Sequence, residues 1–254
     1  MWDCAGVSTV ERYVIPARLP ALVQLYADRV AAPVRFRVPS WEAALADLPG
    51  RPTRLLSDPE VTTEPSNERF RSLGDRVVTR EAVINACASL DLADDEALIA
   101  AFVLVMAWGS GTSNSRSLRN TRKALADIRA AAATLRGSAE ALRTLEQVDH
   151  PEIANIHRGF QLPGVGEAFY TKWFAFGGFV PDRDWQPLIL DSRVRNTLHA
   201  TLDVWLNQLT DTHRDPQRYV AYLGAMHHWA ASLPQPMSAT QLEWILFTHN
   251  GNAA

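Results

Sequence analysis

A chain of 254 residues with 47% hydrophobic residues can bury a full core, either as one domain or as two closely packed lobes. Its formal net charge of −3 excludes a general electrostatic attraction to nucleic acid, so any such contact requires a local basic patch. The two cysteines, Cys4 and Cys87, are too few for a disulfide framework, a cysteine-rich metal site or a four-cysteine iron–sulfur cluster.

Neither a targeting segment nor a membrane span is expected. The N-terminus has no basic region followed by a long apolar run, and no uninterrupted apolar stretch reaches the length of about 18 residues that a spanning helix needs. We therefore expect a cytoplasmic protein that makes no use of a membrane.

The first 78 residues are irregular in pattern, because eight prolines divide them into short pieces. Val34, Phe36 and Val38 alternate with arginines, which predicts a strand over residues 34–38. Residues 49–72 are typical of a polar surface loop. We expect residues 1–78 to form an irregular N-terminal region that packs on a core made of residues 79–254.

After residue 79, apolar residues recur at spacings of three and four, which predicts a mainly α-helical core. Ser238 with Gln241 fits a capping box, and Asp215 before Pro216 is typical of a helix N-cap. The expected helices cover residues 79–90, 94–108, 117–136, 138–148, 167–177, 192–209, 216–232 and 239–248. The helix over 192–209 carries an apolar stripe that should face the core, made of Val194, Leu198, Leu202, Trp205 and Leu209.

A basic segment lies between Ser110 and Arg136 and has a local charge of +5, with Asp127 as its single acidic residue. Its basic residues are Arg116, Arg119, Arg122, Lys123, Arg129 and Arg136. Such a segment is either a solvated helix face or a phosphate-binding surface, and on these residues alone both readings stay open.

The sequence Leu-Pro-Gly-Val-Gly at 162–166 lies between two helical patterns and predicts a helix-hairpin-helix turn within about residues 152–177. Gly164 and Gly166 permit tight backbone geometry there. The backbone amides of Gly164, Val165 and Gly166, at the N-terminus of the following helix, can hold a phosphate group.

Lys172 occupies a position at which a helix of this kind should be apolar. On a helix from Gly166 to Phe176, the residues Phe169, Lys172, Trp173 and Phe176 fall within about 100° of arc. An ammonium group among aromatic rings loses hydration, which favours its neutral form and makes the nitrogen available as a nucleophile or Schiff-base amine. The alternative is a lysine whose stem covers apolar surface while its charged end reaches water.

Asp191 follows the apolar run Leu-Ile-Leu at 188–190 and begins a helix, so its local structural role is an N-cap. A carboxylate held by helix amides is fixed in position and is kept ionised by the helix dipole. Such an anion can also stabilise positive charge that develops on a sugar. The capping role and a catalytic role are therefore compatible.

These motifs together resemble those of a known superfamily. The stretch from Leu162 to Arg195 contains the hairpin LPGVG, then FYTKWFAF around Lys172, then LILDSRVR around Asp191. It resembles the helix-hairpin-helix DNA glycosylases, most closely the bacterial and plant proteins with the 8-oxoguanine glycosylase (OGG) fold. The likeness extends more loosely over residues 79–250, including MAWGSG at 106–111, Tyr219, Tyr222, Trp229 and the segment 243–247.

The resemblance implies a mainly α-helical, two-lobed protein with an active cleft between the lobes. In that superfamily, a lysine on the second hairpin helix attacks the sugar and an aspartate at the start of a later helix assists it. Lys172 and Asp191 match those two positions, although in the eukaryotic 8-oxoguanine enzymes the lysine follows the hairpin glycine almost immediately. The reaction gives a Schiff base that permits strand cleavage, and it requires neither a metal nor an organic cofactor.

The resemblance also implies how this chain would hold its partner, double-stranded DNA that contains a modified base. The target base has to leave the helical stack before it can be excised. We expect a monomer that grips phosphates through Gly164, Val165, Gly166, Arg116, Arg119, Arg122, Lys123 and Arg195. The residues expected to line the base pocket are Trp108, Phe169, Trp173 and Trp229, each of which could instead be a core residue.

The identity of the excised base stays open between two readings. The family name implies 8-oxoguanine and a role in repair, whereas the action of some bacterial relatives against phage DNA implies a hypermodified base such as a glucosylated cytosine. Two other functions compete with base excision. One is a helix-hairpin-helix protein that binds DNA without catalysis, and the other is a helical protein-interaction domain.

Overall fold

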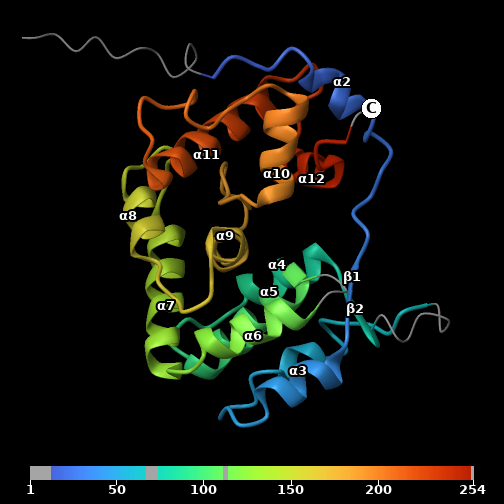
Figure 1. Ribbon diagram of the computed structural model, residues 1–254, viewed down its shortest axis with the longest axis vertical. Coiled ribbons are helices and arrows are strands. Elements are labelled where there is room, and N and C mark those ends of the chain that lie inside the picture. Colours follow the sequence, from blue (N-terminus) through green and yellow to red (C-terminus); the bar gives the residue numbers. More distant parts are fainter. Residues whose placement is uncertain (1–12, 67–73, 111–113, 253–254) are drawn as a thin grey trace, which may run out of the picture. The chain divides into compact units, whose positions relative to one another are not determined.

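The computed structural model describes residues 13–66, 74–110 and 114–252 (Figure 1). Within them the chain is mainly helical, as the sequence predicts, and the strands form one two-stranded sheet. Unit 1 takes its described residues from the stretches 1–29, 145–158 and 184–254, and unit 2 takes its own from 30–144 and 159–183. The division expected at residue 78 separates the chain differently and stays a prediction.

Unit 2 is built around helix α5 (Asp95–Ser110), labelled in Figure 1. Every residue from Leu98 to Ala107 is buried, which is the pattern of a helix that is covered on all sides. Helices α4 (Arg80–Ala88), α6 (Asn114–Ala124), α7 (Ile128–Thr144) and α9 (Glu167–Gly177) pack against it. The core of unit 2 therefore lies along α5.

The strand expected over residues 34–38 is shorter than predicted. Strand β1 (Val34–Phe36) pairs antiparallel with β2 (Arg76–Val78), a strand that the sequence pattern did not indicate. Val38 instead begins helix α3 (Val38–Leu45), where its backbone N–H donates to a side-chain oxygen of Asp75 at 2.8 Å. Proline at the start of α3 favours the change from strand to helix.

Most described residues of the segment expected to be a polar surface loop are exposed or half-buried, but the prediction is wrong for Pro52, Leu56 and Thr62, which are buried. A 3₁₀ turn, η1 (Arg54–Leu56), places Leu56 in the interior with no exposed surface. The hydroxyl of Thr62 donates to the carbonyl of Leu56 at 3.0 Å and closes the turn. Residues 67–73 of the expected loop lie outside the described residues.

The helices expected over 117–136 and 138–148 are divided at a different place. The helical backbone is interrupted between α6 and α7, where a side-chain oxygen of Asp127 accepts the backbone N–H of Ala130 at 3.0 Å. Helix α7 then continues through Gly137 and ends at Thr144. Asp127, which caps a new helix, therefore separates α6 from α7. Gly137 is exposed in the middle of α7 and does not end that helix, because a glycine there costs only about 1 kcal/mol.

Unit 1 contains helices α2 (Leu19–Gln24), α10 (Ser192–Asn196), α11 (Asp215–Ser232) and α12 (Ala239–His249), together with all of α8 (Glu152–Gly159) except Gly159. Helix α12 packs against both α10 and α11. The predicted cap at Ser238 is confirmed, since its side chain accepts the backbone N–H of Gln241 at 3.1 Å. The predicted N-cap of α11 is wrong by one residue, because Asp215 is already helical and Arg214 precedes it.

The helix expected over 192–209 ends early. After α10 the backbone widens into a single π-helical turn, η3 (Thr197–Thr201), and Asp203 adopts a left-handed conformation with φ of 56°. The expected core stripe is wrong at one position: Trp205 is 48% exposed, whereas Val194, Leu198, Leu202 and Leu209 are buried. None of the helices in the described part of the chain combines the length and the apolar content that crossing a bilayer demands.

Candidate functional site

The hairpin turn at residues 162–166 starts α9 in the way that the sequence predicts. The backbone N–H of Val165 donates to the carbonyl of Leu162 at 3.0 Å, and Gly164 has a φ of 80°, which favours glycine. Gly166 is the extended N-cap of α9. Pro163, Gly164 and Gly166 are exposed, so the positive end of the α9 dipole lies next to solvent.

Lys172 is buried on α9, with a relative exposure of only 4%. Its Nζ donates to the carbonyl of Ala168 at 2.7 Å and lies 5.5 Å from the centre of the Phe169 ring. The side chain thus runs back toward the N-terminus of its own helix, the direction that long side chains take on an α-helix. The alternative of a lysine that reaches into water does not fit this burial.

The stem of Lys172 fits against a glycine of the central helix. A Cβ atom at Gly109 of α5 would lie 2.7 Å from Cδ and 3.2 Å from Cε of Lys172, and 3.5 Å from the ring of Phe169. Real Cβ atoms do not approach other carbons as closely as 2.7 Å. Glycine at this position therefore creates the space that the lysine occupies.

Gly109→Ala is expected to lower the rate of base release in single-turnover assays while the protein remains folded. The added methyl group displaces Lys172, and a shift of about 1 Å in a reacting group can cost about 100-fold in rate. The matched control is Gly137→Ala on α7, where an added Cβ has no neighbour within 4 Å. It should leave the rate unchanged and raise stability by about 0.5–1 kcal/mol. An unchanged rate in Gly109→Ala contradicts the role of this fit.

Two of the four aromatic residues expected in the base pocket are core residues. Trp173 has no exposed surface, and its Nε1 donates to the hydroxyl of Ser138 at 3.1 Å. Trp229 is 1% exposed and donates to the carbonyl of Val14 at 3.1 Å. Phe169 and Trp108 are partly exposed in unit 2. Of the four, Phe169 and Trp108 thus keep accessible ring surface, and Phe169 is the one whose ring lies near the Lys172 amine.

The end of α9 is fixed by two half-buried arginines. Arg143 donates to the carbonyl of Gly177 at 2.9 Å and to that of Cys87 at 2.7 Å. Arg183 donates to the carbonyl of Gly178 at 3.0 Å, and burial lowers its pKa to about 10. Both guanidinium groups lie at the negative end of the α9 dipole. Burial also raises the pKa of the Cys87 thiol to about 12, so this cysteine is a poor nucleophile at neutral pH.

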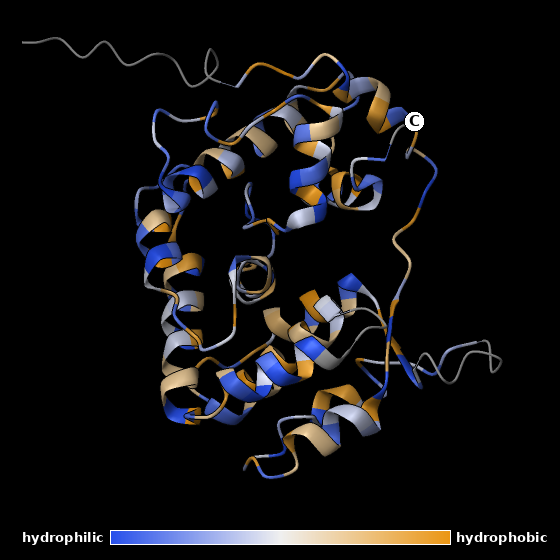
Figure 2. Ribbon diagram, in the orientation of Figure 1, coloured by the Kyte–Doolittle hydropathy of each residue, from blue (hydrophilic) through white to orange (hydrophobic). Residues whose placement is uncertain are grey.

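The hairpin turn lies next to the basic helix α6. A Cβ at Gly164 would lie 3.5 Å from the Cα of Asn120 on α6. Around the helix, Arg116, Arg119 and Lys123 lie within about 100° of arc that also includes Asn120. All three side chains are exposed, and Figure 2 shows hydrophilic stretches along α6. Unit 2 thus places the exposed turn and three positive charges on neighbouring surface.

The other basic residues of the segment have different surroundings. Arg122 pairs with Asp47 at 2.6 Å, and Arg129 is exposed on α7. Arg136 donates to the carbonyl of Leu92 at 2.7 Å and forms an ion pair with Asp95. Arg136 therefore holds the start of α5 and does not belong to the α6 surface.

Replacing Arg116, Arg119 and Lys123 together by glutamine is expected to reduce the salt dependence of DNA affinity. Each lost phosphate contact lowers the slope of log K against log salt by about 0.9, so the triple variant should lose roughly two to three units. The measurement is fluorescence anisotropy with duplex DNA at salt concentrations from about 50 to 200 mM, a range over which such slopes can be determined. As a comparison, the single variant Arg122→Gln should change the slope less than Arg119→Gln does, because Arg122 is already paired with Asp47. An unchanged slope in the triple variant would show that this face does not contact DNA.

Asp191 in unit 1 caps α10, as the sequence predicts. Its Oδ1 accepts the backbone N–H groups of Arg193 at 3.0 Å and Val194 at 3.2 Å. The residue is 7% exposed, so its carboxylate is both buried and held by two amides. A carboxylate fixed in this way is oriented before a substrate arrives.

The segment before Asp191 is held by three buried side chains that sequence reasoning did not identify as positioning groups. Tyr219 and Tyr222 on α11 donate their hydroxyl protons to the carbonyls of residues 188 and 189, each at 2.8 Å. The Oε2 atom of Glu243 on α12 accepts the backbone N–H of Ile189 at 3.0 Å. In the sequence, the signal for such a role was the presence of these polar groups on helix faces that are otherwise apolar. Together they fix the extended residues that lead to Asp191.

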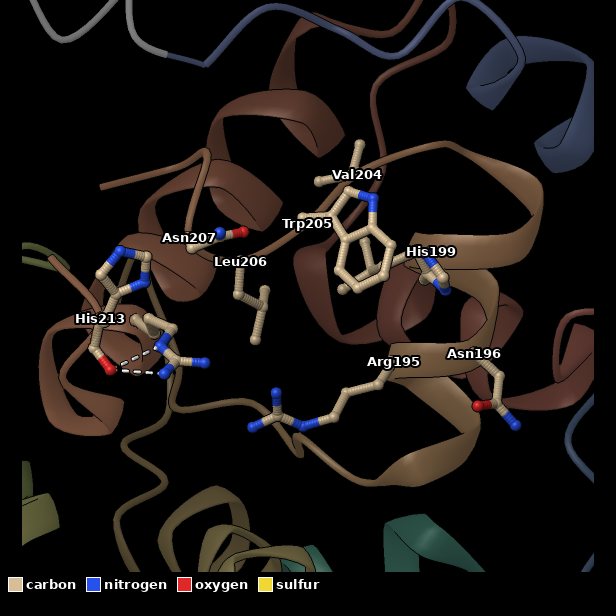
Figure 3. A pocket seen from close by; sticks show the side chains of 10 residues that line it. Arg195, Asn196, His199, Val204, Trp205, Leu206, Asn207 and His213 are labelled. Atoms are coloured by element: carbon tan, nitrogen blue, oxygen red, sulfur yellow. Dashed lines mark hydrogen bonds between the residues drawn. The ribbon is translucent and has the colours of Figure 1, made fainter. Parts of the chain in front are cut away.

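Two arginines follow Asp191 on α10. The backbone N–H of Arg195 donates to the carbonyl of Asp191 at 3.0 Å, and its side chain lines a pocket of unit 1 (Figure 3). The guanidinium of Arg193 lies 4.3 Å above the ring of Phe247. The structure thus groups Lys172 with Gly109 and the hairpin in unit 2, and Asp191 with Arg195 and Trp229 in unit 1.

In the described residues, no group of three or more His, Cys, Asp or Glu side chains could hold a metal ion. No curated protein and no solved structure matches the chain. One family model, described as "Putative 8-oxoguanine DNA glycosylase OGG-like protein", matches residues 28–247. This range contains the hairpin, Lys172, Asp191 and the side chains that position them. The chain belongs to this OGG-like family, which suggests a DNA glycosylase.

Proposed function

We propose that the protein is a DNA glycosylase that removes a modified base, with Lys172 as its nucleophile and Asp191 as its electrostatic partner. The observation that carries the proposal is the buried amine of Lys172, for which Gly109 leaves space on the neighbouring helix. A lysine with a purely structural role would be expected at the surface, where water can solvate its charged end. The family match over residues 28–247 supports the same reaction class.

The first step of the proposed reaction is displacement of the base from an everted nucleotide. The nitrogen of Lys172 attacks C1′ of the deoxyribose with its lone pair, and the bond between C1′ and the base nitrogen breaks. The bonding electron pair leaves with the base, which then takes up a proton. The lysine nitrogen loses a proton and remains bonded to C1′.

Asp191 acts on the charge of the transition state. Positive charge develops at C1′ and on the ring oxygen as the base departs, and a fixed carboxylate stabilises that charge more effectively than mobile water does. The two amide hydrogen bonds to Oδ1 hold the carboxylate for this purpose. The cap therefore contributes to catalysis by orienting the group.

The covalent intermediate also accounts for strand cleavage. Opening of the sugar ring converts the Lys172 adduct into a Schiff base, with a carbon–nitrogen double bond at C1′. Loss of a proton from C2′ then expels the 3′ phosphate, and water releases the lysine from the remaining sugar. This sequence is the lyase activity that we propose alongside base excision.

The proposed partner is double-stranded DNA with a modified base, bound by a monomer. The hairpin amides at Gly164 and Gly166 would hold one phosphate at the start of α9, whereas the expected contribution of Val165 does not fit, because its backbone N–H donates to the carbonyl of Leu162. Arg116, Arg119 and Lys123 lie on the surface beside that turn, and Arg195 would contact the backbone from unit 1. Phe169 and Trp108 offer ring surface for the extruded base.

The substrate is tested by mass spectrometry of free bases that the protein releases from different DNAs. We propose 8-oxoguanine, which would place the protein in repair, or a hypermodified base such as glucosylated cytosine, which would place it in defence against phage. The panel is oxidised duplex DNA, phage DNA with glucosylated cytosine, and unmodified DNA, each with the wild type and with Lys172→Gln. A base released only by the wild type identifies the substrate. Binding without release from any of them would favour the non-catalytic DNA-binding function.

A further inference from the structure

Unit 1 contains a pocket of about 350 Å³, and Arg195 is the single residue of its lining to which the proposed base excision assigns a role. It lies between the end of α10, the turn η3, residues 204–207 and the start of α11. We call it the Trp205 pocket. Sites for small ligands have volumes of about 300–1,000 Å³, so this pocket is large enough for one small molecule. It is too small for a helix or a folded partner.

Trp205 is the exposed aromatic side chain in the lining of this pocket. It is 48% exposed and is the only Trp, Tyr or Phe in the described residues that is classed as exposed. The early end of the helix after η3 turns the indole out of the core, and the His199 ring lies against it (Figure 3). Tryptophan at the wall of a pocket is typical of a surface that stacks on a flat ring.

The charged lining of the pocket is entirely basic. Arg195, Arg218, His199 and His213 line it, and none of its lining residues is an aspartate or glutamate. The Nε of Arg218 donates to the carbonyl of His213 at 3.1 Å, and a terminal nitrogen of the same guanidinium forms an ion pair with Asp215, outside the lining, at 3.3 Å. Both contacts fix the position of that guanidinium. In Figure 3 the Arg195 side chain extends across the pocket below the indole of Trp205. Two guanidinium groups at one site suit a phosphate, which they bind through paired hydrogen bonds.

We propose that the Trp205 pocket binds a nucleotide, with the base stacked on Trp205 and the phosphate held by Arg195 and Arg218. The amide of Asn207, which also lines the pocket, can both donate to and accept from a base edge. The combination of an exposed indole, an amide and two arginines matches the three chemical parts of a nucleotide better than it matches an inorganic anion. The ligand is either a free mononucleotide or an unpaired nucleotide of a DNA strand.

Isothermal titration calorimetry separates these two sources. The ligands for the first arm are deoxyadenosine 5′-monophosphate, deoxyadenosine and inorganic phosphate. Those for the second arm are an unmodified duplex with one unpaired nucleotide and the same duplex fully paired. All titrations use wild type, Trp205→Ala, Trp205→Phe and Arg195→Gln. The charge-matched control is Arg214→Gln, an exposed arginine outside the pocket.

Tighter binding of the monophosphate than of deoxyadenosine or phosphate would support a free nucleotide as ligand. Tighter binding of the duplex with the unpaired nucleotide, without binding of the monophosphate, would support a strand nucleotide. In either case Trp205→Ala should lower the affinity for the preferred ligand by about tenfold or more, and Trp205→Phe should lower that affinity less. Arg195→Gln should also weaken it, and Arg214→Gln should not.

Two results would overturn the proposal. One is equal affinity of wild type and Trp205→Ala for both the monophosphate and the duplex with the unpaired nucleotide, at unchanged thermal stability. The other is binding of inorganic phosphate as tight as that of the monophosphate, which would make the pocket a simple anion site. The proposal does not depend on base excision, because unmodified ligands are used and Lys172→Gln should bind them as the wild type does. Failure of one proposal is thus distinguishable from failure of the other.

Discussion

Lys172→Gln is expected to lower the single-turnover rate of base release by at least about 1,000-fold, because it removes the nucleophile and leaves no other amine in its place. DNA affinity should change little, since the substitution leaves the hairpin turn and α6 intact. The rate is measured by the appearance of free base, and affinity by anisotropy at one salt concentration. Borohydride should trap the wild type on substrate DNA but should not trap Lys172→Gln.

Lys172→Met is the matched control for folding. Methionine is unbranched and apolar, so it can fill the space beside Gly109 without placing an amine in the core. We expect it to be at least as stable as the wild type and as inactive as Lys172→Gln. Retained activity in both variants would remove Lys172 from the mechanism. Base release by the wild type without a trapped adduct would instead indicate that water is the nucleophile and that no lyase step occurs.

Asp191→Asn is expected to lower the rate of base release by roughly 100- to 1,000-fold, the range found when one stabilising group of a transition state is removed. Asparagine caps a helix about as well as aspartate does, so the hydrogen bonds to Arg193 and Val194 can be kept. The substitution therefore removes the negative charge while the start of α10 is preserved. Single-turnover rates and the free energy of unfolding in urea measure the two effects separately.

Asp191→Ala distinguishes the charge from the cap. It removes both, and loss of an N-cap costs about 1 kcal/mol of stability. If the carboxylate acts on developing charge, the asparagine and alanine variants should be similarly slow although only the alanine variant is destabilised. A rate that falls in Asp191→Ala but not in Asp191→Asn would show that Asp191 serves only to hold the helix.

Several local features could be predicted from the sequence because their causes lie within one helical turn. The start of α9 follows from the glycines of the hairpin, and its end at Gly177 agrees with the predicted range 167–177. The caps at Asp191 and Ser238 depend on a side chain and on amides two or three residues later. The hairpin motif and the two catalytic candidates were therefore accessible from a single sequence.

The end of α10 could not be predicted, because distant residues decide it. The hydroxyl of Thr197 in η3 donates to the carbonyl of Leu246 in α12 at 2.6 Å and accepts the backbone N–H of Gly251 at 3.0 Å. These contacts stabilise a widened turn in a stretch whose apolar spacing indicates a longer helix. The exposure of Trp205, and with it the Trp205 pocket, follows from that turn.

The sequence by itself determined the mainly helical class, the hairpin and the Asp191 cap, and it pointed to Lys172 as the candidate nucleophile. Only the tertiary structure decided that Gly109 accommodates Lys172, that Trp173 and Trp229 are core residues, and that Tyr219, Tyr222 and Glu243 hold the segment before Asp191. The physical reason is that backbone geometry responds mainly to neighbours in the chain. Burial and side-chain contacts depend on which remote elements pack together, and one sequence does not specify those partners residue by residue.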